Sequence, residues 1–105
     1  MSEKRTPAYD LDAFKRAFPR SNGVSVTTTA LRSAATLGLT RSGIGEIVRT
    51  MERRQFYKSM TSYADNRVWQ DVYHVPSQFG VLYVKFTAGE LTEFLLLSFK
   101  ERDDG

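Results

Sequence analysis

The sequence of 105 residues contains no cysteine and only one histidine, His74. Without cysteine there can be no disulfide, thiol nucleophile, iron–sulfur cluster or cysteine-ligated zinc. A single histidine excludes metal motifs that need a histidine pair, and nothing near it supports a serine–histidine–aspartate triad. Glycine-rich phosphate-binding loops are also missing. We therefore expect no metal and no cofactor, which leaves metal-free acid–base chemistry or binding without catalysis.

Long apolar runs are missing as well. No stretch approaches the roughly 18 residues of a membrane span. The charged start, residues 1–5, has no apolar segment behind it. We therefore expect no signal peptide, no membrane association and a cytoplasmic location. At roughly 100–200 residues per domain, the chain is predicted to be a single domain over residues 1–105. Its net charge of +3 permits a polyanionic partner without requiring one.

Residues 7–54 are predicted to be mainly helical. Apolar residues at helical spacing predict a helix over 10–18, which Asp10 or Asp12 can cap and which ends at Pro19. They also predict a further helix that opens at Thr40 or Ser42. Between them, residues 24–26 suggest a short strand, and the threonines at 27–29 offer N-cap hydroxyls for another helix. Gly38 suits the left-handed position after that helix. The apolar residues expected on the three helices are Leu11, Phe14 and Phe18; Leu31, Ala34, Ala35 and Leu37; and Ile44, Ile47, Val48 and Met51.

From residue 55 the apolar period changes to two, which predicts strands over 55–63, 67–75, 80–88 and 93–101. The links between them are short and turn-like, including residues 76–79, and short links favour antiparallel hairpins. The sequence thus predicts an α+β fold in which N-terminal helices pack on one face of a C-terminal antiparallel sheet.

Because alternate strand residues point to opposite faces, the strands also predict which side chains gather together. Leu95, Leu97 and Phe99 are expected in the core. One consistent register places a basic and aromatic set on the opposite face, with no carboxylate among them: Lys58, Gln70, His74, Tyr83, Lys85, Ser98 and Lys100. Lysine binds phosphate as a point charge and aromatic rings stack on bases, so this face suits a phosphodiester backbone.

Simpler interpretations of the same residues remain open. An antiparallel sheet normally has one solvated face, where lysine and glutamine are common. A lone histidine near a strand end is more often a surface residue than a catalytic one. Trp69 is expected to anchor the core, and Asp71 to satisfy backbone or arginine groups. Pattern alone indicates a basic α+β domain that can bind nucleic acid.

Four blocks of the second half carry a resemblance to a known family. They are Phe56-Tyr57-Lys58-Ser59-Met60-Thr61, Trp69-Gln70-Asp71-Val72-Tyr73, Leu82-Tyr83-Val84-Lys85 and Leu97-Ser98-Phe99-Lys100. They resemble the motility quorum-sensing regulator (MqsR) toxins, as does the opening Glu3-Lys4-Arg5-Thr6-Pro7. The resemblance spans almost the whole chain, and the first two blocks are its most specific part.

The resemblance implies a type II toxin with the RelE-like fold. Such proteins are endoribonucleases that cut messenger RNA, with a preference for GC-containing triplets, and thereby inhibit translation and growth. The implied partner is a cognate antitoxin with a zinc-binding region and a helix-turn-helix DNA-binding region. The alternative from another class is a non-catalytic module that binds RNA through the basic face or a protein through an exposed strand edge.

Carried over residue by residue, the resemblance ties Tyr57, Lys58, Gln70, Tyr83 and Lys100 to activity. With His74 added, the predicted catalytic residues are Lys58, Gln70, His74, Tyr83 and Lys100. The predicted RNA-binding residues are Tyr57, Met60 and Lys85. Tyr57 is adjacent to Lys58 and should point to the other face, unless a bulge or a strand end turns it.

The chain departs from the family pattern at His74, where members typically carry an arginine. An arginine would clamp phosphate with a bidentate fork, whereas a histidine can supply acid–base chemistry near neutral pH. The loops at 19–24 and 88–93 look altered, and the tail 102–105 looks extra and acidic.

Metal-free cleavage would proceed by attack of the 2′-OH on the adjacent phosphate. We expect Lys58 and Lys100 to stabilise the phosphorane, or one of them to act as the base if crowding lowers its pKa.

Overall fold

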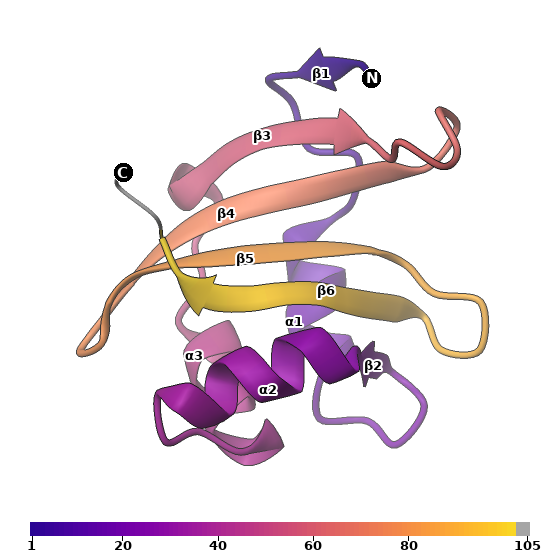
Figure 1. Ribbon diagram of the computed structural model, residues 1–105. Coiled ribbons are helices and arrows are strands. Elements are labelled where there is room, and N and C mark those ends of the chain that lie inside the picture. The colour runs from indigo at the N-terminus through magenta and orange to yellow at the C-terminus, as the bar shows by residue number, and fades with distance from the viewer. Residues whose placement is uncertain (103–105) are drawn as a thin grey trace.

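A computed structural model describes residues 1–102 and confirms the α+β class (Figure 1). Residues 103–105, most of the tail noted above, lie outside the described residues. In the described part the helices are α1 (Leu11–Ala17), α2 (Thr28–Thr36) and α3 (Arg41–Arg49), with a 3₁₀ turn, η1, at Arg53–Gln55. The strands are β1 (Glu3–Lys4), β2 (Val24–Val26), β3 (Phe56–Thr61), β4 (Trp69–Ser77), β5 (Gly80–Ala88) and β6 (Phe94–Glu101).

Helices α1 and α2 begin where the sequence supplies capping groups. The Asp10 carboxylate accepts the backbone N–H of Asp12 at 2.9 Å and starts α1, and the Thr27 hydroxyl accepts the N–H of Ala30 at 3.1 Å and starts α2. As expected, Gly38 follows α2 with a positive φ of 79°. Within residues 1–102, none of the helices combines the length and the apolar character that crossing a bilayer requires.

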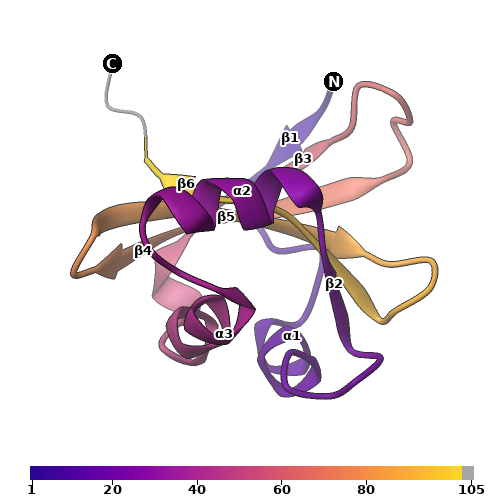
Figure 2. The same ribbon diagram turned by 60° about the horizontal axis from the view of Figure 1, so that its bottom comes forward.

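The expected apolar stripe of α2 is partly wrong. Ala30 and Ala34 are buried, whereas Leu31 and Ala35 are exposed. Figure 2 shows the reason: α1 and α3 lie below the sheet, but α2 runs level with its edge beside β6. A helix in that position contacts the sheet through a narrow strip, and small alanine side chains allow its close approach.

The sheet has the strand order β1-β3-β4-β5-β6-β2, and its neighbours are antiparallel except for β2 and β6, which are parallel. The two-residue β1 was not expected, because two residues cannot show a period of two. Strand β4 also runs on through Pro76 to Ser77, where a turn was expected. Pairing of β3 with β4 ends at Tyr73, so Pro76 lies beyond that ladder, where strand proline is tolerated.

The core lies between the sheet and the helices α1 and α3. Phe14 of α1 stacks on Phe86 of β5 with ring centroids 3.9 Å apart. The β6 residues in the core are Phe94, Leu96 and Phe99, so the expectation for Leu95 and Leu97 was wrong. The β5–β6 register shifts between Lys85 and Phe86, and this bulge changes the alternation of β6 on either side of it.

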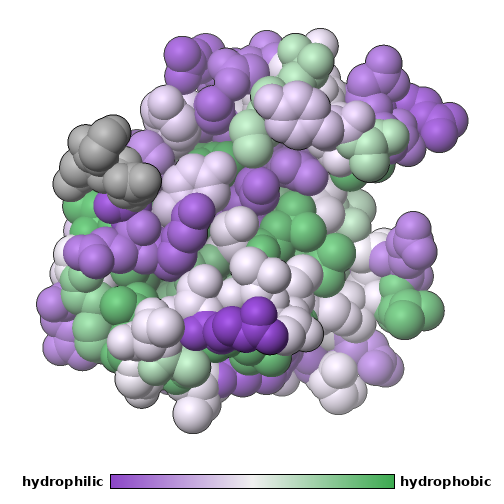
Figure 3. All heavy atoms as spheres, in the orientation of Figure 1, coloured by the Kyte–Doolittle hydropathy of each residue, from purple (hydrophilic) through white to green (hydrophobic). Residues whose placement is uncertain are grey.

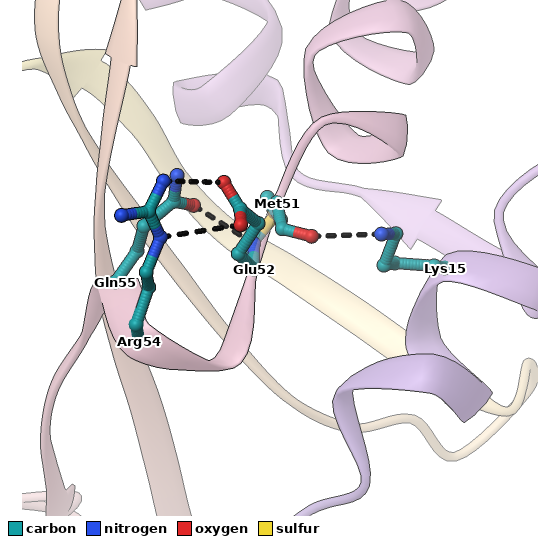
Figure 4. A network of polar contacts seen from close by, with 5 residues as sticks. All are labelled: Lys15, Met51, Glu52, Arg54 and Gln55. Carbon is teal, nitrogen blue, oxygen red and sulfur yellow. Dashed lines mark hydrogen bonds and ion pairs between the residues drawn. The ribbon is translucent and has the colours of Figure 1, made fainter.

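Polar contacts join the helical layer to the start of β3 (Figure 4). Lys15 of α1 donates to the carbonyl of Met51 at 2.7 Å. The next residue, Glu52, forms a capping box with Gln55 across η1 and is paired with Arg54 at 3.1 Å. These contacts fix the path by which the chain leaves α3 and enters β3.

Candidate active site on the open face of the sheet

The sheet face that points away from α1 and α3 is called the open face below. Strand registers confirm that the predicted side chains share it. Three cross-strand rows run over it: Met60 and Gln70; Lys58, Val72, Lys85 and Ser98; and His74, Tyr83 and Lys100. In Figure 3, which has the orientation of Figure 1, hydrophilic side chains lie above and to the left of a smaller apolar patch. The structure therefore brings together side chains from four strands.

Tyr57 reaches the open face through a β-bulge. Phe56 pairs with Tyr73 and Lys58 pairs with Val72, so Tyr57 is the extra residue between them. Its ring stacks on His74 with centroids 4.3 Å apart at an interplanar angle of 21°. Simple alternation put Tyr57 on the other face unless a bulge intervened, and the bulge is present. The side chains of Tyr57 and Lys58 consequently both lie on the open face.

A carboxylate lies at this surface, contrary to expectation. Glu3 of β1 pairs with Met60 in the β1–β3 ladder, and its carboxylate accepts a hydrogen bond from the Lys58 ammonium at 2.6 Å. That hydrogen bond raises the pKa of Lys58 and lowers the pKa of Glu3. A two-residue strand shows no period of two, so the pairing that brings Glu3 here could not be inferred from pattern.

The lysines of the open face differ in their protonation behaviour. Val72 is fully buried between Lys58 and Lys85 in its row, which shows that neighbouring side-chain stems cover it. Burial, and secondarily the charge of Lys100, lowers the pKa of Lys85. The expectation that Lys58 could be the depressed lysine is wrong, because Glu3 raises its pKa instead.

Aromatic groups form the second part of the site. His74 lies 6.2 Å from Tyr83 between ring centroids, in addition to its stack on Tyr57. Burial, with a contribution from the positive charge of Arg102, lowers the pKa of His74, so its imidazole is neutral at pH 7. Burial raises the pKa of Tyr83 against the opposing effect of Lys58, so its phenol holds its proton. The Lys100 ammonium lies 5.5 Å from the centre of the Tyr83 ring.

Gln70 lies where two hollows of the open face meet. One, of about 350 Å³, is also lined by Met60 and Lys85. The other, of about 690 Å³, is also lined by Leu95 and Leu97, which the β6 bulge leaves on this side. Gln70 thus lines both hollows. A third hollow, of about 640 Å³, is lined by residues of α1, β2 and α3 and contains none of the predicted site residues.

The N-terminal segment makes contacts with β3 and β4 that side-chain periodicity did not predict. Arg5 donates to the carbonyl of Tyr57 at 3.4 Å and lies over its ring. Asp71 is fully buried and accepts the backbone N–H groups of Ala8 and Tyr9 at 3.0 and 2.9 Å, as expected of a carboxylate that satisfies backbone groups. Trp69, expected in the core, is only partly buried, with the Lys4 ammonium 4.3 Å from its ring.

Among residues 1–102, no three histidine, cysteine, aspartate or glutamate side chains lie close enough together to hold a metal ion. The open face instead presents ammonium groups, stacked rings, one amide and the Glu3 carboxylate. Lysines that surround a phosphodiester can offset its charge, and exposed rings can stack on its bases. The arrangement suits a single-stranded nucleic acid laid across β3 to β6.

Comparison with known proteins adds two findings. A family model described as "Motility quorum-sensing regulator, toxin of MqsA" matches residues 6–101. The "mRNA interferase toxin MqsR" of Escherichia coli (strain K12) is 38% identical to this chain over 100 residues, which is 95% of this chain and 99% of the relative. Every predicted catalytic and RNA-binding residue lies within the range that the family model matches.

Proposed function

The chain belongs to the motility quorum-sensing regulator family, the toxins of MqsA, and on that premise we propose that it is an endoribonuclease toxin that cleaves messenger RNA. The observation that carries this proposal is the bulge in β3. It turns Tyr57 and Lys58 onto one surface, where strands β4 to β6 add Gln70, Tyr83 and Lys100. The E. coli relative is named an mRNA interferase, and the same activity here would arrest translation and growth.

We propose that cleavage proceeds without metal, by attack of the 2′-OH on the adjacent phosphate. The products are a 2′,3′-cyclic phosphate and a 5′-hydroxyl. Lys58 and Lys100 stabilise the negative charge of the phosphorane, because their ammonium groups approach the same surface from opposite sides. The Gln70 amide positions the phosphate. DNA is a poor substrate, since it lacks the attacking 2′-OH.

The protonation states bear on the remaining roles. Tyr83 holds its proton at neutral pH because burial raises its pKa, so its phenol can protonate the 5′ leaving oxygen. His74 is neutral and belongs to the acid–base candidates. Lys85, Tyr57 and Met60 contact the RNA on either side of the cleaved bond. Tyr57 and His74 already stack on one another, so a base can extend that stack.

The proposals on the cleaved sequence and on the protein partner rest on membership of the family rather than on the geometry of the open face. We propose that cleavage prefers GC-containing triplets. We further propose that the toxin is held inactive by a cognate antitoxin that carries a zinc-binding region and a helix-turn-helix region. Growth arrest on induction, relieved by co-expression of the neighbouring antitoxin frame, would support this pairing. Arrest that the neighbouring frame does not relieve would contradict it.

The activity is tested with purified protein and single-stranded RNA in excess chelator. The parent protein should cleave, and Lys58→Ala should lose at least about 10²-fold in rate because it removes charge stabilisation of the transition state. Lys4→Ala is the matched control, since Lys4 lies on the neighbouring strand over Trp69. Binding of RNA without cleavage would favour the non-catalytic alternative, and equal rates for parent and Lys58→Ala would refute the proposed site.

A further inference from the structure

Strand β1 brings a carboxylate into a surface that otherwise gathers cations. We propose that Glu3 is the general base that accepts the proton of the attacking 2′-OH. This inference rests on the proposed ribonuclease activity and assigns one of its roles. Glu3 precedes the range matched by the family model, which begins at residue 6.

The position of Glu3 is fixed by backbone contacts. The N–H of Ser2 donates to the Thr61 hydroxyl at 2.8 Å, and the N–H of Thr61 donates to the carbonyl of Ser2 at 2.9 Å. Glu3 then pairs with Met60, so its side chain lies on the open face, whereas the next residue, Lys4, lies over Trp69 on the other side. Strand alternation therefore commits Glu3, and not its neighbour, to the candidate site.

Contact with Lys58 places the carboxylate beside the reacting phosphate. The Lys58 Nζ lies 2.6 Å from the Glu3 Oε1, and 20% and 46% of the two side chains are exposed. The phosphate that Lys58 binds must therefore come within reach of Glu3. The Lys58 hydrogen bond occupies one acceptor site of Oε1, so the Glu3 carboxylate keeps lone pairs that can accept the proton of the 2′-OH.

Protonation states exclude Lys58 and Tyr83 as the acceptor and leave Glu3 and the neutral His74, and of these two Glu3 is the one hydrogen-bonded to Lys58. Lys58 and Tyr83 hold their protons at neutral pH, because contact with Glu3 raises the pKa of the first and burial raises the pKa of the second. The charged groups that face Glu3 are Lys58 from β3 and Arg5 from its own segment, and both lower the pKa of the carboxyl group. Glu3 is consequently ionised over the whole neutral range.

The step balances without any further reactant. The 2′-O–H bond breaks, its proton passes to the Glu3 carboxylate, and the 2′ oxygen forms a bond to phosphorus. The bond from phosphorus to the 5′ oxygen breaks, and that oxygen takes the phenolic proton of Tyr83. Glu3 then releases its proton to water, and the Tyr83 phenolate takes one from water, so both groups are restored.

The test compares Glu3→Gln, Glu3→Asp and the control Lys4→Gln. In Glu3→Gln, kcat should fall about 10²-fold or more, in the range of general acid–base catalysis. Its affinity for an uncleavable RNA with 2′-deoxy at the cut site should stay the same or rise, because a negative charge has been removed. Glu3→Asp should retain part of the activity, and Lys4→Gln should match the parent. Thermal unfolding shows whether each variant is folded.

The pH profile separates Glu3 from His74. If Glu3 is the base, the acid limb of kcat/KM in the parent, which reports the free protein, falls below the ordinary carboxyl range, since Lys58 and Arg5 lower the pKa of Glu3, and His74→Ala leaves that limb in place. A Glu3→Gln protein with kcat within about threefold of the parent overturns the assignment. So does an acid limb near pH 6 that His74→Ala abolishes. A parent that cleaves no RNA overturns the proposed function itself, which is a distinct outcome.

Discussion

Asp71 should be the residue on which the N-terminal segment depends most. Its carboxylate is fully buried and accepts the N–H groups of Ala8 and Tyr9 at 3.0 and 2.9 Å. The Asp71→Ala substitution removes both acceptors at once and leaves two backbone donors without their partners. The same segment leads back to β1, so the loss should reach Glu3 and its contact with Lys58.

The magnitude follows from those two bonds. A hydrogen bond to a charged group contributes about 1.5–3 kcal/mol. Removing the buried charge also removes its desolvation cost, which offsets part of the loss. We expect Asp71→Ala to lower the free energy of unfolding by about 3 kcal/mol, out of the roughly 5–15 kcal/mol typical of a domain. Asp71→Asn keeps one acceptor oxygen and should lose about half as much.

Urea unfolding followed by circular dichroism measures this change, with Glu90→Ala as the control. Glu90 is exposed, and its substitution should change stability by less than about 0.5 kcal/mol. Hydrogen exchange at the amides of Ala8 and Tyr9 should speed up in Asp71→Ala before global unfolding does. A loss below about 1 kcal/mol, or unchanged exchange at these amides, would refute the reasoning that Asp71 holds this segment.

Two further predictions concern the helical half and the open face. Gly38→Ala should lower the free energy of unfolding in urea by about 1 kcal/mol, because φ is +79° and nothing lies within 4 Å of the added Cβ, so only backbone strain acts. Gly38→Asn should lower it by less. Equal stability of the parent, Gly38→Ala and Gly38→Asn would contradict this. His74 is faced by Tyr57, Tyr83 and the charge of Arg102, and burial lowers its folded-state pKa below the usual 6.5. The unfolded state therefore binds a proton more readily, so stability should fall as the pH drops through 6.5 toward the folded pKa, and His74→Gln should lessen that fall between pH 7.5 and 5.5.

Prediction from sequence succeeded where a pattern is local. The four long strands rest on side-chain period. The caps of α1 and α2, expected at Asp10 or Asp12 and among the threonines at 27–29, rest on carboxylate or hydroxyl chemistry within a few residues. It was wrong where a bulge changes the period. Leu95 and Leu97 exchanged places with Phe94 and Leu96, since alternation counts residues and a bulge adds one.

The candidate site shows the same division. Lys58, Gln70, Tyr83 and Lys100 were placed on one face by alternation in separate strands, and the registers agree. Glu3 was missed, because two residues cannot show a strand period. The position of Glu3 depends on the pairing of β1 with β3, which is distant in sequence: Glu3 and Lys58 are 55 residues apart.

The amino-acid sequence by itself determined the fold class, the set of lysine and aromatic residues on alternate strand positions, and the resemblance that named the family. These depend on composition, on local periodicity and on short blocks of residues, all of which can be read along the chain. Only the tertiary structure decided that Tyr57 turns onto the open face beside His74, and that Glu3 pairs with Lys58. Both depend on register between strands, because hydrogen-bonded pairing fixes which residue faces which, and no local pattern records it.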